Sequence, residues 1–162
     1  MAAGDMHVFD EHLEALWNER HNEADTLKAA LIQSNANGGL DPAETDADPT
    51  WGAGGTTNYA AAEVTETGNY TAGGVTLTSV TVTEAAGTVS LNATVPGGSP
   101  TWAQNASNPP DARTLVIYND TDTNKACIAY MDLGADIDMT AGDLTVSFAG
   151  NVIYTSTTTA GT

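Results

Sequence analysis

The fold class is indicated by residues 75–95, which read VTLTSVTVTEAAGTVSLNATV. Apolar residues alternate with threonine over 75–78 and 80–83, and the alternation returns over 88–95. Such alternation is typical of strands with one face buried. Because only the short segment Glu84–Gly87 separates the two runs, we expect them to pair as a β-hairpin.

Further short strands are predicted on both sides of this hairpin. Upstream, the glycine-rich residues 67–77, TGNYTAGGVTL, form a turn that leads into the first strand. Downstream, the apolar run Thr114–Tyr118 predicts a central strand buried on both faces. Shorter strands are predicted at Thr101–Trp102, Ala126–Leu133, Asp143–Phe148 and Val152–Tyr154. Seven or eight short strands joined by Gly, Asn and Asp turns make the protein mainly β, an antiparallel β-sandwich or barrel.

The N-terminal residues have a different periodicity. Residues 6–20 predict an α-helix with one apolar stripe, formed by Phe9, Leu13, Leu16 and Trp17. We therefore expect residues 1–24 to form a helical arm. The next segment, Asp25–Gln33, fits either a helix or a strand, because its leucines and alanines satisfy both spacings.

Residues 34–58 are rich in Asn, Gly, Asp and Pro and predict a long loop. Trp51 is the only aromatic side chain in this stretch. It either anchors the loop to another surface or folds back onto the protein's own core. Residues 155–162 are small and polar and are expected to form a flexible tail. All of residues 1–162 are expected to form a single domain.

The charge composition excludes several classes of partner. The chain has 21 acidic residues against Arg20, Lys28, Arg113 and Lys125, which gives a net charge of -17. Such a chain repels nucleic acid and anionic membranes. The sequence also contains no apolar run of a length that spans a bilayer, and residues 1–10 do not resemble a secretory signal. We therefore expect neither nucleic-acid nor membrane partners.

Common catalytic and nucleotide-binding motifs are not found in the sequence. It has no serine nucleophile elbow, no His-x-x-x-His pair and no phosphate-binding loop ending in Gly-Lys. Two carboxylates can hydrolyse a glycoside, but with 21 acids any pair has little value as a signal. His7, His12 and His21 are not one helical turn apart and are interpreted as ordinary helix residues. The protein is therefore predicted not to be an enzyme and to use no cofactor.

Two further features favour structural roles. The segment Asp120–Asn124 begins like a calcium loop, but Lys125 and Met131 occupy the positions that require Gly and Glu. It is better interpreted as a hairpin turn whose Asn and Asp side chains bond the local backbone. Cys127, the single cysteine, lies in an apolar run and is expected to be a buried, unreactive thiol. No metal site is predicted.

Four segments of the chain, in this order, resemble a family of small virion proteins of tailed bacteriophages. The segments are 9–22, 25–32, 63–77 and 115–134, which include LWNERHN, DTLKAALI, TGNYTAGGVTL and LVIYNDT. The resemblance implies that residues 25–32 form a strand. This chain departs from the family pattern by the long insert Asn35–Asn58 and the proline-rich segment Pro96–Asp111, both of which are candidates for added contact surface.

The resemblance implies a component of the phage particle and, within it, a capsid decoration or cement protein. Such a protein does no chemistry and binds the outside of the lattice formed by the major capsid protein, here expected as a homotrimer. It would be made in the host cytoplasm and reside on the surface of the virion. A tail, neck or fibre component is the alternative.

Contacts with the capsid are expected from the N-terminal helix and the apolar side chains of the loops. The candidate contact residues are Phe9, Leu13, Trp17, Trp51 and Trp102. A second class of function is a carbohydrate-binding or adhesive module, in which Trp51, Trp102 and Tyr59 would stack on sugars. Aromatic residues make up only 6% of the chain, which is few for that task.

Overall fold

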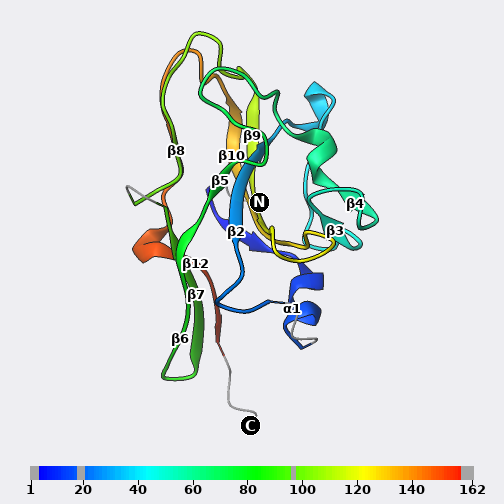
Figure 1. Ribbon diagram of the computed structural model, residues 1–162, viewed down its shortest axis with the longest axis vertical. Coiled ribbons are helices and arrows are strands. Elements are labelled where there is room, and N and C mark those ends of the chain that lie inside the picture. The colour runs from blue at the N-terminus through cyan, green and yellow to red at the C-terminus, as the bar shows by residue number, and fades with distance from the viewer. Residues whose placement is uncertain (1–3, 18–20, 96–97, 158–162) are drawn as a thin grey trace.

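The computed structural model describes residues 4–17, 21–95 and 98–157 (Figure 1). Strands dominate, as predicted, and the helix α1 (Asp10–Trp17) lies near the N-terminus. The strands are β1 (Met6–Val8), β2 (Leu27–Ile32), β3 (Pro49–Thr50), β4 (Thr57–Asn58), β5 (Val75–Thr76), β6 (Thr78–Ala85), β7 (Thr88–Thr94), β8 (Thr101–Trp102), β9 (Ala112–Asn119), β10 (Cys127–Ile137), β11 (Leu144–Thr145) and β12 (Val152–Thr157). Short 3-10 helices are formed by η1 (Asn35–Asn37), η2 (Tyr59–Ala62) and η3 (Ala149–Asn151).

A five-stranded antiparallel sheet, in the order β1-β10-β9-β2-β5, is the centre of the fold. Strand β9 lies in its middle, where Val116 pairs with Tyr130 of β10 and with Ala30 of β2. The prediction of a central strand at 114–118 is thus confirmed. The strand implied at 25–32 is confirmed as well, because alternate residues of β2 are buried on opposite faces of the sheet.

Two small sheets, β12-β7-β6 and β11-β8, cover one face of the five-stranded sheet (Figure 1). The predicted hairpin is β6–β7, and its two turn residues Ala86 and Gly87 have φ of 50° and 79°. Positive φ at both positions is the geometry of a type I′ turn, which matches the twist of the paired strands. The core between the layers includes Leu115 and Ile117 from β9 and Trp102 and Leu91 from the small sheets.

Residues of the long segment 40–62, together with Phe9, cover the other face of the five-stranded sheet. Trp51 stacks on Tyr118 of β9 with ring centroids 4.9 Å apart and an angle of 9° between the planes. Tyr59, in η2, is fully buried in the same cluster. The result is a sandwich whose central sheet is buried on both faces, and no sheet among the described residues closes into a barrel.

Three local predictions are corrected. The helix expected over 6–20 begins only at Asp10, because Met6–Val8 form β1 and pair with the edge of β10; residues 18–20 lie outside the described part. The segment 34–58 is no free loop, since it contains η1, β3 and β4 and packs on the central sheet. In the expected tail, residues 155–157 belong to β12, and 158–162 lie outside the described part.

Candidate functional site

Three of the four segments that carry the family resemblance meet at a buried polar residue, Asn119. Its side-chain amide donates to Asp25 Oδ2 at 2.7 Å and lies 2.9 Å from His21 Nδ1. Its Oδ1 accepts the backbone N–H groups of Thr121 and Asp122 at 2.9 and 3.1 Å. Since Asn119 is fully buried, these bonds satisfy an amide that would otherwise destabilise the fold.

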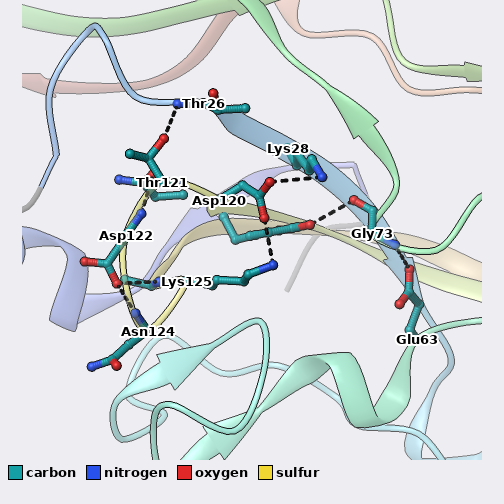
Figure 2. Close-up of polar contacts among 12 residues, drawn as sticks. Thr26, Lys28, Glu63, Gly73, Asp120, Thr121, Asp122, Asn124 and Lys125 are labelled. Carbon is teal, nitrogen blue, oxygen red and sulfur yellow. Dashed lines mark hydrogen bonds and ion pairs between the residues drawn. The ribbon is translucent and has the colours of Figure 1, made fainter.

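The next residue in the chain, Asp120, makes a second set of polar contacts (Figure 2). The ammonium groups of Lys28 and Lys125 lie 3.0 and 2.8 Å from the two carboxylate oxygens of Asp120. The hydrogen bond from Lys125, followed by that from Lys28, lowers the pKa of Asp120. This carboxylate is therefore held charged between two cations, which ties β2 to the β9–β10 turn.

The glycine-rich segment is bonded to the same region. Glu63 accepts the N–H of Gly73 at 2.6 Å, and the Tyr118 hydroxyl donates to the Gly73 carbonyl at 3.0 Å (Figure 2). Burial raises the pKa of Glu63. A Cβ on Gly74 would lie only 2.0 Å from the carbonyl oxygen of Ala29, so glycine lets this segment approach β2. The close spacing of this segment and β2 thus has a structural explanation in backbone contact.

The turn that begins like a calcium loop is a hairpin turn, as interpreted. Asp122 Oδ1 accepts the N–H groups of Asn124 and Ala126 at 2.9 and 3.3 Å, and Lys125 has a φ of 54°. The Asp122 carboxylate therefore bonds the local backbone of the turn. Within the described residues, no group of three or more His, Cys, Asp or Glu side chains is placed to hold a metal ion.

The single cysteine, Cys127, is buried. Burial raises the pKa of Cys127 well above its usual range, as expected of an unreactive thiol.

Of the five predicted contact residues, three belong to the protein's own interior. Phe9, Trp51 and Trp102 are at most 5% exposed, so their side chains are not offered to a partner in this conformation. The side chain of Trp17 lies outside the described part. Leu13 is 47% exposed and remains a candidate.

Leu13 belongs to a larger set of exposed apolar residues. In the described residues the large apolar side chains exposed to solvent are Leu13, Leu16, Val82 and Val89, each 38–50% exposed. Leu13 and Leu16 are three residues apart on α1 and share one side of it. Val82 pairs with Leu91, and Val89 lies two residues from Leu91 on β7, so these three share one face of the hairpin.

An apolar cleft separates α1 from that face of the hairpin. Leu16 and Val82 stand at its rim, and Leu27, Leu91 and Ile128 are among the residues that line it. Its volume is about 50 Å³. Pockets for metabolites and cofactors usually measure about 300–1,000 Å³. The cleft therefore has room for part of an aliphatic side chain, and with the four exposed residues it forms what we call the apolar patch.

Histidine lies at the base of this cleft. His12 is 2% exposed, its Nε2 lies 2.8 Å from the Tyr154 hydroxyl, and its ring centroid is 4.9 Å from that of His21. Burial, followed by the nearby His21, lowers the pKa of His12 to about 3. His12 is a helix residue as interpreted, but His7 lies in β1 and bonds Glu44 at 2.7 Å. The interpretation of all three as helix residues was therefore wrong for His7 and also for His21, which lies after the end of α1 and has no helical structure.

A larger cavity of about 380 Å³ lies beside β9 and β10 and is lined in part by acidic residues. Arg113 bonds both carboxylate oxygens of Asp132, at 2.7 and 3.1 Å, and this lowers the pKa of Asp132. The charges of Arg113 and Asp132 therefore neutralise each other within the chain. Arg113, a cation that lines this cavity, is therefore already paired within the chain.

Comparisons with protein-family models, with curated proteins and with solved structures find no match for this chain. The resemblance to tailed-phage virion proteins therefore depends on the four sequence segments. Among the described residues, no helix combines the length and apolar character needed to cross a bilayer.

Proposed function

We propose that this protein is a non-enzymatic structural component of a tailed-phage particle, namely a decoration protein that binds the outside of the major capsid protein lattice and stabilises the head. The order of the four resembling segments supports the particle assignment. The observation that carries the binding role is the apolar patch, in which Leu16 and Val82 line one cleft while Leu13 and Val89 are exposed on the same helix and the same hairpin face. The decoration role itself comes from the resemblance.

Covering the apolar patch supplies binding energy. Complete burial of a Leu or Val side chain contributes about 1.5–3 kcal/mol, and each of these four is already half buried or more. Their joint coverage is thus worth a few kcal/mol before the cost of association. Exposed apolar groups gathered in this way mark interaction sites in soluble proteins.

The charges around the patch favour a partner other than a second copy. Glu14 on α1, Glu23 at the cleft and Glu84 on the hairpin face are all exposed. A capsid protein can offer basic residues to these carboxylates, whereas two copies of this chain would bring like charges together.

The three aromatic residues named for the carbohydrate-binding alternative are buried. Trp51, Trp102 and Tyr59, the residues that would stack on a sugar, are 0–5% exposed. The tail, neck or fibre role remains the alternative location within the particle. Copy number distinguishes the two, since a decoration protein is present in hundreds of copies and a neck or fibre component in about a dozen or fewer.

The test measures binding of purified protein to heads that lack it. Removing residues 1–24 is unsuitable, because it also removes β1 and the buried Phe9. Instead, Leu13→Ser combined with Leu16→Ser is expected to leave the melting temperature nearly unchanged and to abolish co-sedimentation with heads. Glu11→Ser, on the opposite side of the same helix, is the matched control and should bind normally. A double variant that still saturates the heads would refute the proposed contact.

A further inference from the structure

Charge is distributed very unevenly between the layers of this protein. Residues 67–110 contain one charged residue, Glu84, and residues 144–162 contain none, in a chain with a net charge of -17. These two stretches supply β6, β7, β8, β11 and β12, which form the small sheets. In Figure 1 these sheets make up one side of the molecule. That side carries few charges: Glu84 lies on the hairpin, Glu23 bonds the edge of β6, and Asp143 directly precedes β11.

The outer face of these sheets carries hydroxyl and amide groups. Because Leu91 and Ala93 of β7 point into the core, Ser90, Asn92 and Thr94 point outward. Cross-strand pairing extends this surface over β6 and β12, and Thr101 and Thr145 continue it on β8 and β11. We call it the hydroxyl face, formed by Thr81, Thr83, Thr88, Ser90, Asn92, Thr94, Thr101, Thr145, Thr155 and Thr157.

The side chains of the hydroxyl face are ordered by contacts with one another. Thr88 and Thr157 hydroxyls lie 3.2 Å apart, and those of Thr101 and Thr145 lie 3.0 Å apart. The Asn92 amide donates to the Thr83 hydroxyl at 3.1 Å. Each threonine also presents a methyl group. The face is therefore a regular surface of methyl and hydroxyl groups, and fixing it in an interface costs little side-chain entropy.

Addition of a strand to the open edge of β6 is a less suitable mode of contact. The N–H of Val82 already donates to Glu23 Oε1 at 2.5 Å, which occupies one donor of this edge with a carboxylate. Carboxylates placed against an edge strand discourage pairing with another chain. A contact through the sheet face avoids this obstacle.

We propose that a second copy of this chain packs on the hydroxyl face. Elsewhere on the surface two copies would oppose carboxylates, and burying unpaired charge is costly. The basic residues that the structure describes cannot compensate, because Lys28 and Lys125 contact Asp120 and Arg113 contacts Asp132 within the same chain. The hydroxyl face lets two strongly acidic molecules meet without that cost. This proposal is independent of particle binding, which uses the apolar patch on the opposite side of the hairpin.

The first experiment measures the mass of the purified full-length chain by sedimentation velocity over a range of concentrations, without phage heads. The wild type is expected to form an oligomer. Thr83→Asp combined with Thr155→Asp should raise its dissociation constant at least tenfold, because four or more new carboxylates would meet in the interface. Thr45→Asp, an exposed threonine in the acidic part of the chain, is the matched control and should not. A monomeric wild type, or a double variant that associates normally, would overturn the proposal.

A second experiment is independent of whether the aspartate variants fold. Cys127 is 1% exposed, so a new surface cysteine is the accessible thiol among the described residues. Thr155→Cys treated with a short bismaleimide should give covalent dimers, and their yield should fall when the protein is diluted before the treatment. Thr45→Cys should give little or no cross-linked product under the same treatment, because position 45 lies outside the proposed contact. Equal cross-linking of the two variants would show random collision and would refute the proposed surface.

Discussion

Strands β9 and β6 each contain eight residues, yet their environments are opposite. In β9 seven of the eight residues are buried, and in β6 none is buried. The reason is position, since β9 lies between β10 and β2 with a layer on each face, whereas β6 is the edge of a small sheet. The comparison separates the region that stabilises the fold from the region that is available to partners.

The largest expected effect is at the close approach that completes the central sheet. Gly74→Ala places a Cβ 2.0 Å from Ala29 O and 2.6 Å from Ala30 Cα, at a φ of +70°. Both contacts are with the backbone of β2, which cannot move without breaking its pairing. We expect a loss of at least about 3 kcal/mol in the free energy of unfolding, measured with urea. Gly142→Ala meets nothing within 4 Å and should lie within about 0.5 kcal/mol of wild type.

The same substitution in the two strands tests the comparison directly. Val116→Ala in β9 removes two fully buried methyl groups and should cost about 2–3 kcal/mol, including the cavity left behind. Val82→Ala in β6, where the side chain is 50% exposed, should cost less than about 0.5 kcal/mol. Equal losses in urea unfolding would mean that the hairpin contributes to stability as much as the central sheet does.

An intermediate effect is expected where the shared motifs meet. Asn119→Ala removes the amide that bonds Asp25 and the backbone of the β9–β10 turn, and leaves buried groups without partners. We expect a loss of about 2 kcal/mol, with the melting temperature as the measurement. Asn35→Ala, at an exposed position, is the control and should change little. If Asn119→Ala melts like the wild type, the motifs do not owe their structural role to this network.

The local pattern of apolar and polar residues predicted those strands for which it fits only one kind of secondary structure. The β6–β7 hairpin followed from alternation around a short turn, and β9 followed from a continuous apolar run. Strand β2 was ambiguous in its spacing and was predicted only through the family resemblance, because its identity depends on pairing with β9 on one side and β5 on the other. Strand β1 was missed because three residues cannot establish a period.

The candidate surface was harder to predict, because exposure depends on contacts between distant segments. Phe9, Trp51 and Trp102 are large and apolar, but residues far away in sequence bury them. Val82 and Val89 occupy the apolar positions of alternating strands, yet the hairpin extends beyond the layer that would cover them. One signal was available, namely the nearly uncharged stretch 67–110 in a strongly acidic chain.

The smallest expected effect concerns His12, which lies between α1 and the hairpin with His21, Tyr154 and Glu23 around the cleft. Its pKa of about 3 in the folded protein is below the 6.5 of the unfolded chain, so the unfolded state takes up the proton first as pH falls. Stability that is fully present above pH 6.5 is therefore lost progressively down to about pH 3. Near pH 6 the loss is about 1 kcal/mol or less. Asp120 and Asp132 have lowered pKa values, so the stability that they contribute is present above the unfolded carboxyl pKa and is lost only as the pH falls below it.

Because the titration of His12 affects stability at a higher pH than that of Asp120 and Asp132, measurements between about pH 7.5 and 5.5 report mainly on His12. Melting temperatures of the wild type should fall within it, and those of His12→Gln, which does not titrate, should fall less. His12 belongs to α1 and bonds Tyr154 of β12. The acid-induced loss of stability should therefore begin at the end of the molecule that carries the apolar patch. Hydrogen exchange at pH 5.5 should then show α1 losing protection before β9 does. Simultaneous loss in both elements would mean that the covered central sheet and the open hairpin end unfold as one unit, and that their difference in burial has no counterpart in local stability.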